Sequence, residues 1–144
     1  MGRVTLHVHG NPKNRAARTL LSTYIERLMG HGVKLVVHND RRSTESYIDD
    51  LVGLSGALIL LDEGGDHITS EALAKRLKAW RLEAQDVHLA IGPAEGWNND
   101  ERRHRYPRLS LSSMTFPHEL AAVMLAEQLY RAHEILRGSA YHKA

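Results

Sequence analysis

The sequence predicts an α/β fold in which a mostly parallel β-sheet is flanked by helices. Segment 57–61 is apolar along its whole length, as expected of a central strand that is covered on both faces, and segment 87–91 indicates another buried strand. Stretches with the helical spacing of apolar residues alternate with the strands, and this alternation favours parallel pairing. With 144 residues and a hydrophobic content of 42%, the chain is expected to form a single domain, residues 1–144, around one core.

The N-terminal third of the chain predicts two strands, each followed by a helix. Apolar and polar residues alternate over residues 3–9, which indicates a strand, and Gly10 and Pro12 end it. The other elements expected here are a helix at 15–29, a strand at 33–38 and a helix at 43–54.

The remaining two thirds continue the same alternation. The predicted elements are, in chain order, a strand at 57–61, a turn at 62–67, a helix from Thr69 or Ser70 to residue 81 or 82, a strand at 87–91, a short strand at 108–111 and a helix at 118–136.

Composition excludes several classes of function. The chain has no cysteine, which rules out disulfide bonds, thiolate catalysis and zinc sites built on sulfur. No apolar run approaches the roughly 20 residues that a membrane span needs, and no signal segment is recognisable. We therefore expect a cytoplasmic protein without a membrane partner.

The net charge of +2 is too low for a general nucleic-acid coat, so any contact with a polyanion must come from local patches. Two candidates are visible. One is a group of cations on the helix expected at 69–82, and the other is the segment ERRHRYPR. Their members are Lys75, Arg76, Lys78 and Arg81 in the first, and Arg102, Arg103, Arg105 and Arg108 in the second. The first group fits a solvated surface, whereas a surface role and a binding role are about equally favoured for the second.

Three loop-like segments follow predicted strands at their carboxyl ends. They are Leu61 with Asp62, the segment 92–96 and the segment 111–116. Ligands of parallel sheets bind beyond the carboxyl ends of the strands, so the convergence of these segments predicts a binding site.

Taken singly, the loops are ambiguous. Segment 92–96 lacks the Lys-Ser/Thr of a P-loop and is not a dinucleotide fingerprint, so by itself it fits a simple turn better than a ligand cradle. Segment 110–115 carries three serines and a threonine, whose backbone could read a planar base or could cap the helix at His118.

No metal site and no serine nucleophile are predicted. The chain has ten histidines, and His7 and His9 share a strand face. However, no His-x-x-x-His pair falls on a helix and no acidic cluster accompanies the histidines. A Gly-x-Ser-x-Gly elbow is also absent from the sequence.

The closing helix and the tail carry further signals. Residues 120–126 are seven apolar residues in a row, which predicts cover on several sides and favours a second copy of the chain as part of it. Glu127 and Arg131 lie in this apolar helix, where charges are costly unless they are paired or used. The chain ends with Tyr141, His142 and Lys143, a segment that composition alone would class as an inert terminus.

Four segments together resemble one known family. They are LDEGG, LAIGPAEG, LSLSSMTFPHELAAVMLAEQLYRA and the terminal YHKA. In this order they are similar to the ribosomal RNA large subunit methyltransferase H (RlmH) family, a minimal branch of the SPOUT methyltransferases. The resemblance covers residues 60–143, and the first 55 residues match only in pattern.

The resemblance implies a trefoil-knotted α/β fold, a homodimer and S-adenosylmethionine (SAM) as methyl donor. It further implies methylation of N3 of a pseudouridine in 23S ribosomal RNA, with the assembled ribosome as substrate. Carried over by motif, the cofactor-binding residues are Leu61, Gly92, Leu111, Ser112, Ser113, Met114, Thr115 and Phe116. The substrate-side, catalytic residues are His118, Arg131, Tyr141, His142 and Lys143.

This chemistry needs a group that removes or displaces a proton. N3 of the base is protonated at neutral pH, so His142, or the pair Arg131 and Tyr141, would favour the deprotonated ring. The residues leave open which of them acts as the base. In a dimer, the tail of one subunit could complete the pocket of the other.

One departure from the family pattern is the loop Gly92-Pro93-Ala94-Glu95-Gly96, because relatives usually read Gly-Gly-Pro-Glu-Gly. Pro93 removes a backbone N–H and fixes φ, so the cofactor site could be altered. Arg41 and Arg42 stand where relatives are richer in lysine. Two alternative functions follow: a SPOUT methyltransferase for another RNA such as tRNA, or a non-catalytic ribosome- or RNA-binding module.

Overall fold

A computed structural model describes residues 2–97 and 100–143. The elements are β1 (Val4–His9), α1 (Arg15–Leu28), β2 (Val33–His38), α2 (Thr44–Val52), β3 (Ala57–His67), α3 (Ser70–Leu82), β4 (Val87–Ala90), the 3₁₀ helix η1 (Glu101–Arg105), β5 (Arg108–Ser110) and α4 (His118–Leu136). The alternation of strands and helices predicted from the sequence is confirmed.

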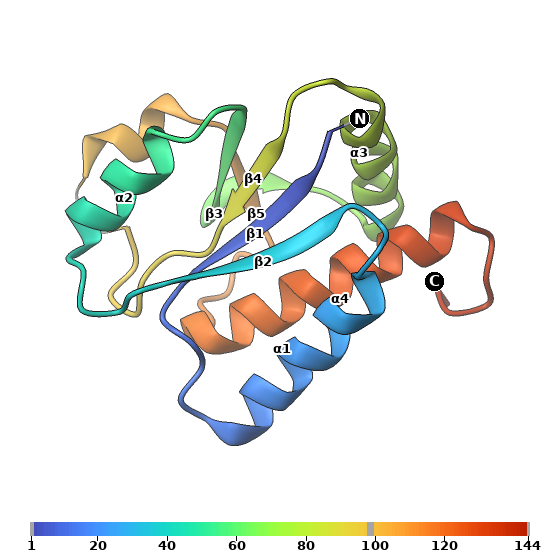
Figure 1. Cartoon of the computed structure of the whole chain (residues 1–144), viewed down its shortest axis with the longest axis horizontal. Coiled ribbons are helices and arrows are strands. Elements are labelled where there is room, and N and C mark those ends of the chain that lie inside the picture. The colour runs from blue at the N-terminus through green and yellow to red at the C-terminus, as the bar shows by residue number, and fades with distance from the viewer. Residues whose placement is uncertain (1, 98–99, 144) are drawn as a thin grey trace.

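The five strands form one parallel sheet in the order β2-β1-β4-β3-β5. Helices α1, α3 and α4 cover one face, and α2 covers part of the other (Figure 1). Alternate residues of a strand point to opposite faces, so Ile59 joins the larger core while its neighbours Leu58 and Leu60 join the smaller one. The predicted fold class is confirmed.

The turn predicted at 62–67 is wrong, because β3 continues to His67. The register against β5 shifts between Leu61 and Asp66, which marks a bulge in β3. Gly65 explains why the strand can continue: a Cβ there would lie 2.5 Å from the carbonyl carbon of Arg108. The glycines and acids that suggested a turn therefore allow a close approach of two strands.

Helix α4 packs against both α1 and α3. This accounts for much of the apolar run at 120–126, since Ala122, Val123, Leu125 and Ala126 are buried within the chain. Leu120 remains 47% exposed. Among residues 2–97 and 100–143, no helix is long and apolar enough to cross a membrane.

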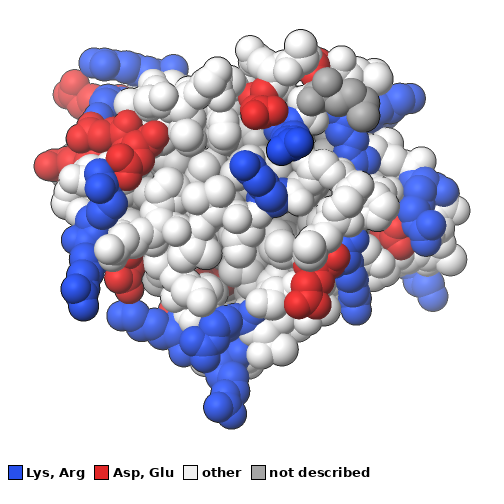
Figure 2. Space-filling model, viewed as in Figure 1, with Lys and Arg blue, Asp and Glu red and all other residues white. Residues whose placement is uncertain are grey.

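Charges of both signs lie side by side around the margin of the face that Figure 2 displays, and its centre is largely uncharged. Several arginines are already paired: Arg42 with Asp50, and Arg102 with Asp49 and Asp100. This distribution agrees with the low net charge and with the expectation that any polyanion contact is local.

A chain of three imidazoles crosses the α2 face of the sheet. The two ring nitrogens of His7 each lie 2.8 Å from a neighbour, Nε2 of His38 and Nδ1 of His88. Nε2 of His88 lies 2.9 Å from the carbonyl oxygen of Ser55, which can only accept. This fixes every tautomer: His88 donates to Ser55, His7 donates to His88, and His38 donates to His7.

We expect acid to destabilise the fold through His7. Burial, followed by the charges of His38, His88 and Lys34, lowers the pKa of His7 from 6.5 to about 3. The folded state therefore binds fewer protons than the unfolded state, and stability is lost as pH falls from about 6.5 towards 3. His7→Gln keeps a donor and an acceptor without titrating, so its free energy of unfolding should fall less steeply than that of the wild type between pH 6.5 and 4.5. Equal slopes in denaturant titrations over this range would contradict the role of His7.

Candidate functional site

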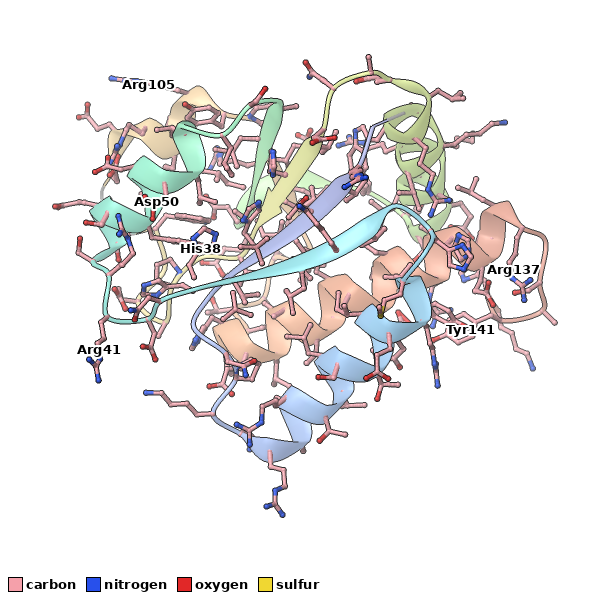
Figure 3. All side chains as sticks on the ribbon, viewed as in Figure 1. His38, Arg41, Asp50, Arg105, Arg137 and Tyr141 are labelled. Carbon is pink, nitrogen blue, oxygen red and sulfur yellow. The ribbon has the colours of Figure 1, made fainter. Side chains whose placement is uncertain are left out.

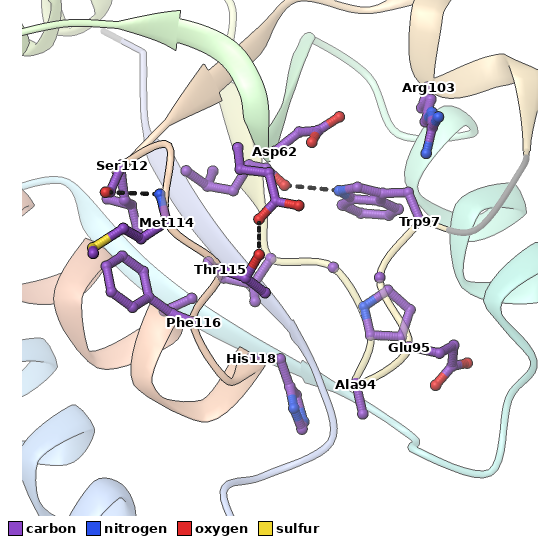
Figure 4. A pocket seen from close by; sticks show the side chains of 18 residues that line it. Asp62, Ala94, Glu95, Trp97, Arg103, Ser112, Met114, Thr115, Phe116 and His118 are labelled. Atoms are coloured by element: carbon purple, nitrogen blue, oxygen red, sulfur yellow. Dashed lines mark hydrogen bonds between the residues drawn. The ribbon is translucent and has the colours of Figure 1, made fainter.

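A cavity of about 470 Å³ opens at the carboxyl ends of β4 and β5 and beside the bulge of β3 (Figure 4). Its lining residues are Leu61, Asp62, Glu63, Ile91, Gly92, Pro93, Ala94, Glu95, Gly96, Trp97, Arg103, Leu111, Ser112, Met114, Thr115, Phe116, His118 and Ala121. The predicted convergence of the three segments at one site is confirmed. Of the residues assigned to the methyl donor, Ser113 belongs to the same loop but lies outside this lining.

One wall of the cavity is the turn that follows β4. The N–H of Gly96 donates to the carbonyl oxygen of Pro93 at 2.8 Å, and Gly96 takes a φ of 76°. The left-handed conformation therefore falls on a glycine, while Pro93 occupies a position where its fixed φ is tolerated. The substitution that departs from the family pattern is built into a regular turn.

Trp97 ends this wall and was not singled out from the sequence. Its indole Nε1–H donates to the carbonyl oxygen of Leu61 at 2.7 Å. The ring is 5% exposed and lies parallel to that of Tyr47, with centroids 5.8 Å apart. An aromatic residue directly after a glycine-rich loop was the only sequence signal for this contact.

The opposite wall is the loop after β5. The hydroxyl of Ser110 donates to the carbonyl oxygen of Ser112 at 2.8 Å, and the hydroxyl of Ser112 accepts from the N–H of Met114 at 3.0 Å. The hydroxyl of Thr115 donates to Glu63 of β3 at 2.8 Å. The N-cap of α4 is Pro117, without a side-chain hydrogen bond, so the loop shapes the cavity and does not cap the helix.

Acidic side chains at the cavity are held by donors from other elements. Asp62 pairs with Arg108 at 2.8 Å. Partial burial alone would raise the pKa of Asp62, but the hydrogen bonds from Arg108 and the Gly64 N–H lower it below its ordinary value. The hydrogen bond from Thr44, 2.7 Å long, likewise lowers the pKa of Glu95. Both carboxylates are thus ionised at neutral pH.

His118, the first residue of α4, is the one predicted substrate-side residue that lines the cavity within the described part of the chain. Asn14 holds the start of this helix, because its N–H donates to Glu119 at 3.0 Å. His118 is therefore positioned by a helix end that the loop after β1 fixes.

Arg131, Tyr141 and His142 form a separate group, which we call the tail cluster. Arg131 forms an ion pair with Glu127, and its Cζ lies 4.9 Å from the centroid of the Tyr141 ring. The Tyr141 hydroxyl also donates to Glu127, at 2.8 Å. The tail that composition classed as inert is thus docked on α4 of its own chain.

The tail cluster also fixes the proton on His142. Arg131 can only donate, so Nδ1 of His142, 3.1 Å from Nη1 of Arg131, is an acceptor. The ring proton then lies on Nε2 and points to Glu71 of α3, at 2.8 Å. Burial, with the hydrogen bond to Glu127, raises the pKa of Tyr141, so its phenol stays protonated. Lys143 is exposed.

The cavity and the tail cluster lie at opposite ends of α4. Arg131 follows His118 by 13 positions in this helix, which corresponds to about 20 Å. Figure 3 shows Tyr141 beside the C-terminal end of α4, on the other side of the molecule from Arg105 in η1. A single chain therefore does not bring its predicted catalytic residues together. Among residues 2–97 and 100–143, no group of three or more His, Cys, Asp or Glu could hold a metal ion.

The family model described as "Predicted SPOUT methyltransferase" matches residues 3–142. A protein of Koribacter versatilis called "Ribosomal RNA large subunit methyltransferase H" is 37% identical over 135 residues, which cover 92% of each chain. The chain belongs to the SPOUT methyltransferase family.

Other relatives with the same name match over a shorter stretch. The protein of Dechloromonas aromatica is 42% identical over 99 residues, 69% of this chain and 64% of its own length. That of Hyphomonas neptunium is 50% identical over 88 residues, 60% of this chain and 57% of its own. The match thus spans less than two thirds of these relatives, and together they place the chain with the methyltransferase H branch of the SPOUT family.

Solved structures agree on the fold. Lpg2936 of Legionella pneumophila, determined in complex with its bound cofactor SAM, has a TM-score of 0.52 at 12% identity and covers 92% of this chain and 66% of its own. TrmJ from Z. mobilis has a TM-score of 0.51 at 8% identity and covers 100% of this chain and 72% of its own. The SPOUT fold predicted from the resemblance is confirmed, and the knot is a property that the family implies.

Proposed function

We propose that this chain transfers a methyl group from SAM to N3 of a pseudouridine in 23S ribosomal RNA. The observation that carries the proposal is the cavity between the loops after β4 and β5, in a chain whose relatives are called ribosomal RNA large subunit methyltransferase H. The assembled ribosome is the proposed substrate. The proposed site of action is the cytoplasm.

The cavity fits the size and character of this cofactor. Its volume of about 470 Å³ lies within the range of small-molecule and cofactor sites. The turn at 92–96 forms one wall, and the loop after β5 supplies apolar and hydroxyl groups on the other through Leu111, Ser112, Met114, Thr115 and Phe116. SAM, when bound, supplies an activated methyl group on a sulfonium. The residues of this chain then have to bind SAM and the base, orient them and remove one proton from the base.

N3 must lose its proton before it can accept the methyl group, and the side chains have to favour this loss. His118 is an imidazole within the cavity, and His142 offers an Nδ1 lone pair once Arg131 releases it. The phenol of Tyr141 serves as a hydrogen-bond donor to charge that develops on the ring, and Arg131 stabilises the same charge. Lys143 adds a cation for the RNA backbone.

In a homodimer, the two groups of residues could meet at one site although they lie apart in a single chain. We propose that the tail of one subunit reaches the cavity of its two-fold partner. The reason is that the tail cluster lies about 20 Å along α4 from the cavity of its own chain. The exposed side chains of Leu120 and Met114, 47% and 72% accessible, lie on α4 and on the cavity loop, where such a partner would cover them.

Two assays test the reaction. Calorimetry should detect SAM binding at micromolar to millimolar concentrations, and tritium should pass from labelled SAM to ribosomes but not to tRNA. Transfer to tRNA would replace the proposed substrate by the first alternative. No binding at millimolar SAM would overturn both enzyme functions and leave the non-catalytic module. The modified position is then mapped by mass spectrometry of nucleosides from ribosomes of a strain without the protein.

His142→Ala should lower methyl transfer far more than SAM binding, because the tail acts on the substrate base. His118→Ala should lower transfer as well. If each site is composite, an equimolar mixture of the two inactive variants should regain about a quarter of wild-type activity, since about half of the dimers are mixed and each has one intact site. Equal losses of SAM affinity and transfer in His142→Ala would show that the tail is structural, and no recovery in the mixture would contradict the shared site.

Pro93→Gly should leave the fold intact and either tighten SAM or leave its affinity unchanged. The turn is held by the contact between Pro93 and Gly96 through backbone atoms, which glycine keeps, and glycine adds one N–H donor. Calorimetry and thermal unfolding measure the two effects. A large loss of affinity at unchanged stability would mean that proline itself shapes the site.

A further inference from the structure

Trp97 joins the two backbone segments that form the cavity. Its Nε1–H donates to the carbonyl oxygen of Leu61 in β3, while the residue itself ends the loop that follows β4. The same indole packs on Gly92, where a Cβ would lie 3.2 Å from both Cε2 and Nε1. Leu61 and Gly92 are residues assigned to the methyl donor, so one side chain touches both.

A second aromatic residue holds Trp97 in place. Tyr47 of α2 is fully buried and stacks on the indole with an interplanar angle of 1°. Its hydroxyl donates to the carbonyl oxygen of Ile91, the residue before Gly92, at 2.8 Å. The carbonyls of Leu61 and Ile91, at the points where β3 and β4 meet the cavity, are therefore both satisfied by aromatic donors of the chain.

We propose that Trp97 is a positioning residue that sets the spacing between the β3 and β4 segments for the methyl donor. The proposal rests on the proposed function. Displacement of the indole by a ligand would remove a buried hydrogen bond, the Tyr47 stack and the contact with Gly92 at once. The indole therefore stays in place when the cavity fills, and the ligand meets N–H groups and side chains at this wall.

Trp97→Phe separates positioning from packing, because phenylalanine keeps an aromatic ring against Tyr47 but has no N–H. The loss of one buried hydrogen bond at the cavity should raise the Kd for SAM about three- to tenfold. The transfer rate at saturating SAM should change little. Trp80→Phe is the matched control, since Trp80 is a similarly buried residue of α3, 9% exposed, outside the cavity lining. It should leave the Kd unchanged even if it lowers the unfolding temperature.

Tryptophan fluorescence supplies a second measurement, which a change in the stability of the fold does not affect. In Trp80→Phe protein, Trp97 is the only tryptophan, and SAM should change its intensity without the red shift that exposure to water produces. In Trp97→Phe protein, the emission of Trp80 should not respond to SAM.

A wild-type Kd in Trp97→Phe protein, or a strong red shift on SAM binding, would overturn the positioning role and leave the proposed function intact. Failure of the wild-type protein to bind SAM would overturn the proposed function, and this inference with it. Gly92→Ala adds a further check: its new methyl group meets the indole in wild-type protein, so the loss of affinity should be smaller in the Trp97→Phe background.

Discussion

The parallel pairing of β3 with both β4 and β5 is the constraint on which the cavity depends. Because these strands run in the same direction, the segments that leave β4 and β5 emerge at one edge of the sheet, beside the bulge in β3. The close approach at Gly65 keeps β3 paired with β5 beyond Leu61, so Asp62 and Glu63 are presented along the cavity and not in a free turn. A side chain at position 65 would separate the strands and the walls together.

Hydrogen bonds from distant parts of the chain then fix the cavity. Thr115 reaches Glu63, Arg108 reaches Asp62 and Thr44 reaches Glu95, so each acidic side chain at the cavity is held by an element other than its own. At the wall that follows β4, Tyr47 and Trp97 hold the carbonyl oxygens of Ile91 and Leu61. The result is a largely preformed site, in which little conformational entropy remains to be lost when a ligand binds.

In the single chain, hydrogen bonds hold the residues of the tail cluster in fixed positions away from the cavity. Glu127 accepts hydrogen bonds from both Arg131 and Tyr141, which offsets the cost of placing a carboxylate on a largely apolar helix. His142 is held between Arg131 and Glu71 in one protonation state. In the proposed dimer, these contacts would compete with contacts to the neighbouring cavity, so the tail would exchange one set of hydrogen bonds for another.

Outside segment 62–67, the alternation of strands and helices could be predicted from the sequence, because apolar periodicity reports directly which face of a helix or strand is buried. The sequence also determined that the segments at Leu61, Gly92 and Leu111 meet at one edge, since parallel strands leave no other arrangement. That segment 62–67 is a strand could not be predicted locally, because its pairing depends on the backbone of Arg108, 43 positions beyond Gly65 in the chain. The same holds for Trp97: its partners Tyr47 and Leu61 come from α2 and β3, and no local pattern encodes a contact with them. The helix predicted at 118–136 already separates Arg131 from His118, but the place of His142 depends on tertiary contacts with Arg131 and with Glu71 of α3.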